Sequence, residues 1–396
     1  MKKVQSQELR PRELDVFSAR VRDARLLAGL RSSEAADHLG ITRVRYSRLE
    51  TSSSTVSIDE NLLRQLGTLY GFESRFFTVA PSANAVSNGL RFRAQRSMTK
   101  FDEEAIEVWS RVASELLEVV SLHIKPIPLL VPTFEVTPGP EQSADEVRRL
   151  LGIDVDEPVV HVIRAIERAG VPVLCAPFDV RGAAKHDAVS LWTGVQFDRP
   201  LVLLRQTNSW ERIRMSAAHE LGHLVLHRWH VPENAEDEAF AFGSAFLMPA
   251  RGFRMDWPGR VTLANLMPLK RKWGVSLAAL IERAYRLGLV GAELRSGLYK
   301  QLSARRNSET GKTWRVEEPG STEREPEAPW LVGKMIETAY GPEGSASALS
   351  DEIGYWPPKF VSPLLQGQRK PKRRLQSLGL AERAEPTSNV TPIFGR

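Results

Sequence analysis

The sequence predicts a multidomain protein with an all-α N-terminal domain, an α+β domain in the middle and a partly helical, partly disordered C-terminal region. The chain has 396 residues, which is too long for one ordinary core. Apolar residues recur at helical spacing in its N-terminal part and again after residue 100, with a small, polar stretch between. Strand-like runs interrupt the helices only in the middle of the chain, at 171–178, 188–197 and 200–205.

These patterns divide the chain into four segments. The helical N-terminal domain is expected over 14–78, and 79–142 is expected to hold a linker followed by one long amphipathic helix at 102–124. The α+β domain is expected over 143–295. The remaining segment, 296–396, is rich in Pro, Glu, Arg and Ser, with one helical stretch at 329–341 and a basic cluster at 368–374.

The composition indicates in which cell compartment the protein lies and what kind of partner it binds. A net charge of +6 and a pI near 9.4 favour an anionic partner. The single cysteine, Cys175, cannot form an intrachain disulfide, and its apolar surroundings favour a buried, inert thiol. We find no apolar run long enough to span a bilayer and no signal core, so we expect a cytoplasmic protein with no membrane partner.

The N-terminal domain shows the pattern of a helix-turn-helix. Four helices are expected, at 13–30, 32–40, 41–50 and 57–71, the last with Ser57 as its cap. Gly40 allows a tight turn between the second and third, with Ile41 packed into the core. Thr42, Arg43, Arg45 and Tyr46 are expected to face a DNA major groove, whereas Val44 and Leu49 are expected to be buried.

The stretch "HELGH" predicts a metal site. His219 and His223 lie four residues apart, so on a helix they occupy one face with Cβ atoms about 5–6 Å apart. Two imidazoles at that spacing can bind one zinc ion, and Glu220 between them is the residue type that takes a proton from the attacking water in zinc hydrolases. A chance pair of histidines on a polar helix face is the alternative interpretation.

A third ligand is expected from the next helix, at 233–248. Glu236 lies on the same side as the apolar face of that helix and is the favoured ligand, with Glu238 as second choice. His227 continues the face of His219 and His223, but three consecutive turns of a straight helix rarely converge on one ion. We therefore expect His227 to contact a ligand rather than the metal, and His230 to take no part. The strand at 201–205, which precedes the motif, has the pattern of an edge strand.

The middle of the chain resembles the ImmA/IrrE metallopeptidases. The resemblance rests on "RIRMSAAHELGHLVLH" followed by "AEDEAFAFGSAFLMP" and extends over about 145–290. It implies a zincin-like fold with zinc bound by His219, His223 and Glu236, and with Glu220 as catalytic base. It also implies cleavage of a peptide bond in a regulatory protein, often a repressor. The family usually has Asn or Asp where this chain has Phe240, which puts turnover in doubt.

The segment "ARLLAGLRSSEAADHLGITRVRYSRLETSSS" resembles the Cro/C1-type (XRE) helix-turn-helix, which implies binding to a double-stranded DNA operator. Arg31 and Ser32 stand where that family usually has Ser/Thr-Gln, and a helical bundle that binds protein is the alternative.

Three functions follow from the two resemblances. The first is a transcription regulator with a zinc endopeptidase that cleaves a repressor or an antitoxin. The second is a regulator whose peptidase-like domain is a non-catalytic sensor or dimerisation module. The third is an antitoxin-like protein that binds its own operator and a toxin. A homodimer is compatible with all three.

Overall fold

A computed structural model describes the chain between residues 13 and 368, with gaps. The second part of the predicted linker lies outside the described residues, as does the basic cluster apart from Gln368. The C-terminal tail predicted to be disordered also lies outside them. The described residues are 13–82, 100–125, 127–132, 134, 138–177, 187–194, 196, 198–205, 207, 209–341 and 349–368.

The N-terminal region is helical, but it also contains a small sheet. β1 (Glu13–Phe17) pairs antiparallel with β2 (Thr55–Asp59), so the prediction of an all-α domain is wrong in this respect. Val16 is buried and Leu14 packs on the same core, a period of two that competes with helical spacing over these few residues. The helices of this region are α1 (Ser18–Leu27), α2 (Ser32–His38), α3 (Arg43–Thr51), α4 (Glu60–Tyr70) and α5 (Ser74–Thr78).

The helices α2 and α3 meet at the predicted tight turn. Gly40 has a φ of +64°, a left-handed conformation that suits glycine, and Ile41 packs against the core as predicted. The start of α4 differs from the prediction. Its cap is Asp59, whose Oδ1 accepts a hydrogen bond from the Leu62 amide at 2.8 Å, because Ser57 is taken up in β2.

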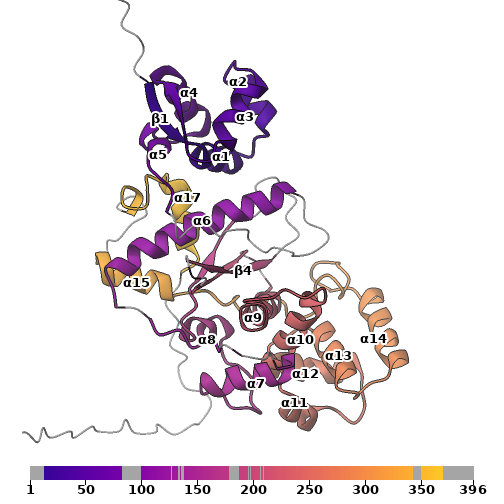
Figure 1. The fold of residues 1–396 in the computed structure, drawn as a ribbon. Coiled ribbons are helices and arrows are strands. Elements are labelled where there is room, and N and C mark those ends of the chain that lie inside the picture. The colour runs from indigo at the N-terminus through magenta and orange to yellow at the C-terminus, as the bar shows by residue number, and fades with distance from the viewer. Residues whose placement is uncertain are drawn as a thin grey trace, which may run out of the picture.

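A three-stranded sheet lies in the middle of the molecule (Figure 1). Its strands are β3 (Val173–Cys175), β4 (Ala188–Thr193) and β5 (Arg199–Leu204), in the order β3-β5-β4. β5 runs parallel to β3 and antiparallel to β4, with Ser190 opposite Val202. The predicted strands are therefore confirmed. The expectation that 201–205 is an edge strand is wrong, since β5 is central and β4 lies at the edge.

The two faces of this sheet are buried in different cores. Leu201 and Leu203 of β5 belong to one hydrophobic cluster, and Val202 and Leu204 belong to another. Successive side chains of a strand point to opposite faces, so this alternation places each cluster on one face. We call these clusters the first core and the second core.

The first core joins the N-terminal region to the sheet. It contains side chains of α1 to α5 together with α6 (Lys100–Leu122), α15 (Leu331–Tyr340) and α17 (Pro358–Gln366). In Figure 1, α6 passes between the N-terminal helices and the sheet. Arg20 of α1 donates to Glu115 of α6 at 3.0 Å, and the indole of Trp356 donates to the same carboxylate. The predicted long helix is thus a packed part of the fold and not only a connection.

The second core covers the other face of the sheet. Residue 295, the predicted end of the α+β domain, lies inside the helix α14. Leu298 and Leu302 of this helix are buried in the second core. The helix predicted at 329–341 is confirmed as α15. The helices of the second core are α7 (Pro140–Leu150), α8 (Val162–Arg168), α9 (Trp210–Leu226), α10 (Ala235–Leu247), α11 (Ala250–Asp256), α12 (Leu263–Trp273), α13 (Leu277–Arg286) and α14 (Ala292–Ala304).

The composition led to two further expectations, one about the single cysteine and one about membrane-spanning segments. Cys175 lies on β3 and is 5 % exposed, which confirms a buried thiol. Among the described residues, no helix combines the length and the apolar character that crossing a membrane requires.

Candidate metal centre

The helix α9 carries both histidines of the predicted site. It begins after Ser209, whose hydroxyl accepts a hydrogen bond from the Arg212 amide at 3.2 Å. Its apolar residues are buried against β4, β5 and α10, which fixes the rotation of the helix. His219 and His223 then lie one turn apart on the side that faces the start of α10.

Two glycines let α9 and α10 approach closely. A Cβ atom on Gly222 would lie 3.1 Å from the carbonyl oxygen of Ala239, and one on Gly243 would lie 3.0 Å from the amide nitrogen of His219. Larger residues would therefore push the helices apart. This close contact brings Glu236, in the first turn of α10, over the two histidines of α9.

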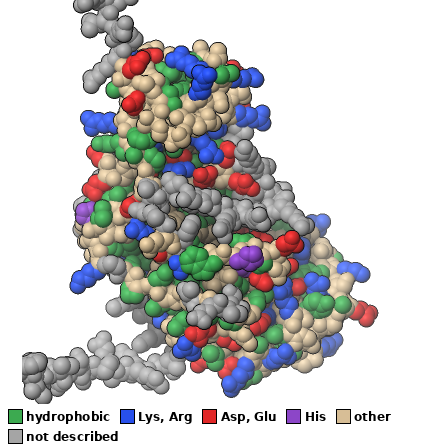
Figure 2. Space-filling model, in the orientation of Figure 1, with side chains coloured by type: hydrophobic (Ala, Val, Ile, Leu, Met, Phe, Trp, Pro, Cys, Tyr) green, Lys and Arg blue, Asp and Glu red, His purple; other side chains and the backbone are tan. Residues whose placement is uncertain are grey.

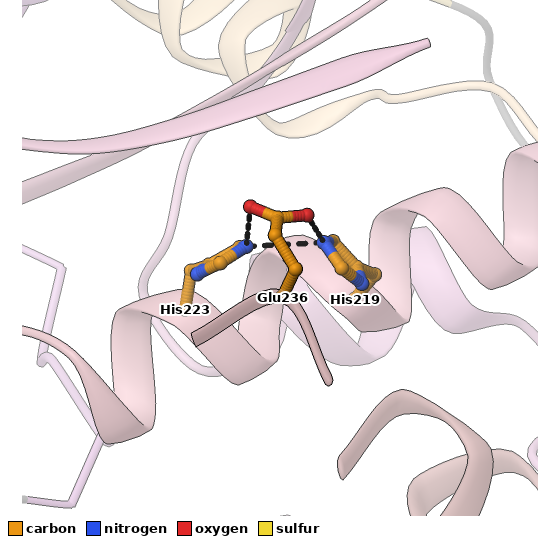
Figure 3. Close-up of side chains that lie close together, drawn as sticks. All are labelled: His219, His223 and Glu236. Atoms are coloured by element: carbon orange, nitrogen blue, oxygen red, sulfur yellow. Dashed lines mark hydrogen bonds and ion pairs between the residues drawn. The ribbon is translucent and has the colours of Figure 1, made fainter. Parts of the chain in front are cut away.

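The three side chains converge (Figure 3). The Nε2 atoms of His219 and His223 are 3.0 Å apart, and each lies 3.4 Å from an oxygen of Glu236. They form the one group of three or more candidate metal donors found among the described residues. Their side chains are 17 %, 20 % and 39 % exposed, so solvent reaches the cluster. The structure therefore brings the two histidines together with the favoured ligand, Glu236.

Hydrogen bonding in this cluster shifts the pKa of two of its members. Hydrogen bonds from His219 and His223 hold the pKa of Glu236 well below its ordinary value of 4.5. Burial alone would lower the pKa of His223, but the hydrogen bond to Glu236 and the nearby charge of Glu220 raise it above 6.5. Glu236 is therefore a carboxylate at neutral pH, which is the form that binds a cation.

Glu220 is not one of the three donors, and its side chain contacts the sheet. Its side chain is buried, and its Oε2 accepts a hydrogen bond from the hydroxyl of Ser190 on β4 at 2.6 Å. One oxygen of the predicted base is thus fixed by the edge strand. We did not predict this role for Ser190. One signal in the sequence could have indicated this role. Ser190 is a polar residue between the apolar residues Val189 and Leu191 of a strand, so it lies on the opposite face from them, toward α9.

The other two histidines of the stretch differ from each other. His227 is the residue that ends α9, and it is buried with its Nδ1 atom 2.9 Å from Nδ1 of His223. Burial lowers its pKa below the ordinary value. His227 therefore contacts His223, one of the two histidines expected to bind the metal. His230 is exposed, as expected for a residue outside the site. Glu238, the second-choice ligand, contacts His227 and is not part of the three-donor cluster.

Phe240 lies one turn after Glu236 on α10. Its ring is partly buried, and the guanidinium of Arg286 lies over it, with Cζ 5.3 Å from the ring centre. A phenyl ring neither donates nor accepts a strong hydrogen bond. The side chain at this position therefore contributes to packing between α10 and α13 rather than to the polar surroundings of the site.

The residues predicted to face DNA do not all lie on the surface. Tyr46 is fully buried, with its hydroxyl 2.6 Å from that of Tyr70 and donating to Glu50 at 2.7 Å. The prediction that Tyr46 faces the groove is therefore wrong. Val44, predicted to be buried, is 66 % exposed. The reason is helical phase: Tyr46 and Leu49 are three residues apart and share the buried face of α3, and Val44 points across from them.

The other three predicted contacts are exposed. Thr42 caps α3 by accepting a hydrogen bond from the Arg45 amide at 3.2 Å. Arg43 projects from the first turn of α3, and the guanidinium of Arg45 lies 3.9 Å from the carboxylate of Asp59. DNA contact by these three residues stays a prediction.

Comparison with known proteins finds a family match in the middle of the chain. No curated protein matches this sequence, and no helix-turn-helix family model matches the N-terminal region. The family model Peptidase_M78, IrrE N-terminal-like domain, matches residues 166–285. The matched segment extends from the end of α8 to α13 and contains the three donors and Glu220. This part of the chain is therefore similar to the IrrE N-terminal-like domain, a peptidase family.

Proposed function

We propose that this chain is a DNA-binding transcription regulator that carries a zinc-dependent endopeptidase of the ImmA/IrrE type. The proposed substrate is a regulatory protein such as a repressor or an antitoxin. The observation that carries the peptidase assignment is the convergence of His219, His223 and Glu236, with Glu220 on the next position of the same helix. The match of residues 166–285 to the IrrE N-terminal-like domain supports it.

The geometry of the three donors fits zinc. Ligands held tetrahedrally at about 2.0–2.1 Å from a zinc ion lie roughly 3.3 Å from one another. The distances between the three donor atoms are 3.0, 3.4 and 3.4 Å. Two imidazoles and one carboxylate are also one of the donor sets of catalytic zinc sites, which keep a fourth position for water or substrate. A bound zinc ion would polarise the peptide carbonyl and make the attacking water more acidic.

The side chain of Glu220 fits the role of base. Ser190 donates to its Oε2, so a proton from water would be taken up at Oε1 and passed to the leaving amine. The bond to Ser190 limits rotation of the carboxylate and holds it in one orientation. The edge strand that provides Ser190 pairs with β5 on one side, and a polypeptide substrate in extended form could pair with its other side.

Metal analysis and cleavage assays on two proteins test this proposal. Purified wild type and Glu220→Gln are both expected to contain about one zinc ion, because Glu220 is not in the donor cluster. Only the wild type is expected to shorten a co-expressed cellular protein, as shown by mass spectrometry of peptide ends. Absence of zinc from both proteins would refute the peptidase. Zinc in both without Glu220-dependent cleavage would favour the alternative of a non-catalytic sensor, to which Phe240 also points.

The N-terminal region supports the DNA-binding part of the proposal. The helix α3 follows the Gly40 turn and exposes Arg43 and Arg45 in its first turn. Lys and Arg side chains project from the N-terminal part at the top of Figure 2. Guanidinium groups at the start of a helix can pair with guanine in the major groove, at about 1–3 kcal/mol for each good pair.

Binding to DNA from upstream of its own gene tests this assignment. The variant Arg43→Ala/Arg45→Ala is expected to lose sequence preference and to keep salt-dependent, nonspecific binding. Arg64→Ala removes an exposed charge from a different helix, α4, and is expected to keep the preference. Unchanged sequence preference in the double variant would refute α3 as the recognition helix.

A further inference from the structure

His227 and Glu238 form a chain of polar contacts behind one of the proposed ligands. His227 Nδ1 lies 2.9 Å from Nδ1 of His223, and His227 Nε2 lies 3.1 Å from Oε2 of Glu238. The other oxygen of Glu238 accepts a hydrogen bond from the side-chain amide of Asn234 at 3.0 Å. This series of polar contacts therefore leads from the start of α10, through His227 after the end of α9, to Nδ1 of His223.

The chemistry of these atoms allows one arrangement of protons when a metal is bound. His223 turns its Nε2 toward the other donors, so its proton must be on Nδ1. That proton points at Nδ1 of His227, which must accept it. His227 then carries its own proton on Nε2 and donates it to Glu238. Every other arrangement places two donors or two acceptors against each other.

The contact between His223 and His227 is shielded from water, so the positions of its protons depend on the protein. The side chain of His227 is 4 % exposed and that of His223 is 20 % exposed, so water has little access to the contact between the two imidazoles. A buried nitrogen that loses its hydrogen-bond partner is costly. The arrangement of protons is therefore set by side chains of the protein rather than by solvent.

We propose that His227 and Glu238 are positioning residues that fix the tautomer and the ring orientation of His223 for metal binding. This inference rests on the proposed metal site and adds two residues to it. Neither residue belongs to the three-donor cluster. Carboxylates and imidazoles that hold the far nitrogen of a ligand histidine commonly contribute about 10–100-fold in metal affinity.

Metal affinity of the full-length protein tests the inference without relying on peptidase activity. Metal is removed with a chelator, and Zn²⁺ binding is measured by competition with a chromophoric chelator. Co²⁺ binding is followed through its visible absorption bands, which report the geometry of the ligands. His227→Ala is expected to weaken Zn²⁺ binding by about 10–100-fold and to change the Co²⁺ bands. Glu238→Ala is expected to weaken binding less, because one more hydrogen bond separates it from His223.

A conservative variant separates positioning from packing. His227→Asn keeps an oxygen near the place of Nδ1, so it is expected to recover part of the affinity lost in His227→Ala. His230→Ala and Asp237→Ala replace an exposed histidine and an exposed carboxylate near the same site, and both variants are expected to bind within about 2-fold of the wild type.

The outcomes distinguish the positioning role from the metal site itself. Wild-type affinity in both His227→Ala and Glu238→Ala would overturn the positioning role and leave the metal site intact. Equal losses in His227→Ala and His227→Asn would also overturn it, since an acceptor oxygen near the place of Nδ1 would then have no effect on metal binding. A wild-type protein that binds neither metal would overturn both proposals.

Discussion

Replacement of Glu327 by glutamine tests the electrostatic contact that ties the segment before α15 to the helix of the metal centre. Glu327 is buried between α9 and the start of α8. It pairs with Arg214 of α9, lies 3.0 Å from Nδ1 of His161 and accepts a hydrogen bond from the Ile163 amide at 2.9 Å. Burial alone would raise the pKa of Glu327, but Arg214 and His161 lower it to about 2.

This pKa sets the expected size and pH dependence of the effect. The ordinary pKa of the carboxyl group is 4.5, and its lowering to about 2 corresponds to about 3 kcal/mol of folding stability at neutral pH. A carboxyl group whose folded pKa is lowered stabilises the protein fully above pH 4.5. This contribution falls as the pH drops toward 2, and at pH 3 less than half of the roughly 3 kcal/mol is left. Glu327→Gln removes it and also leaves the buried Arg214 without its carboxylate partner.

Urea unfolding followed by circular dichroism measures the effect. We expect Glu327→Gln to lower the free energy of unfolding by roughly 3 kcal/mol at pH 7, and the difference from the wild type to shrink as the pH falls from 5 to 3. Glu337→Gln is a matched control, because Glu337 is half-exposed and pairs with Lys334 on the surface, so it should cost at most about 0.5 kcal/mol. Unfolding of Glu327→Gln at wild-type urea concentrations, or a difference that stays constant with pH, would refute this reasoning.

Three further substitutions test the site and the N-terminal region. Ser190→Ala removes the hydrogen bond to Glu220, and we expect kcat for peptide cleavage to fall by about 10-fold with unchanged zinc content, measured by steady-state assay and metal analysis. Gly243→Ala places a methyl group 3.0 Å from the amide of His219, so we expect a loss of about 1–3 kcal/mol in urea unfolding and weaker zinc binding in chelator competition. Tyr46→Phe removes a buried hydroxyl with two hydrogen-bond partners and should lower the unfolding free energy by about 1–2 kcal/mol, whereas an unchanged value would place that side chain on the surface.

The candidate metal centre is the part of the molecule that the sequence predicts best. The spacing of His219 and His223 follows from the helical repeat, and the apolar residues of the next helix selected Glu236 over Glu238. Both arguments use contacts within one helix or between adjacent helices. The contact of Ser190 with Glu220 was not predictable in the same way, because it depends on how a strand lies across α9.

The errors in the N-terminal region have a local cause. α3 spans only 9 residues, and its buried face was assigned from Val44 because valine is apolar. Tyr46 takes that place because its ring is apolar and its hydroxyl finds partners inside the domain. The strand β1 was missed because 5 residues with Leu14 and Val16 inside also fit the beginning of a helix. The packing of α15, α17 and the segment before α17 against α6 depends on contacts more than 200 residues apart, such as that of Glu115 with Trp356.

The burial of both faces of the central sheet restricts which insertions and deletions the chain can accept. A shift of one residue along a strand exchanges its two sets of side chains between the faces. In β5 such a shift would exchange Leu201 and Leu203 with Val202 and Leu204, which are all apolar. In β4 it would replace Ser190 with Val189 or Leu191 beside the carboxylate of Glu220. Length changes between residues 176 and 199 are therefore tolerated only where they keep β4 in phase, so that a hydroxyl and not a hydrocarbon contacts the carboxylate of Glu220.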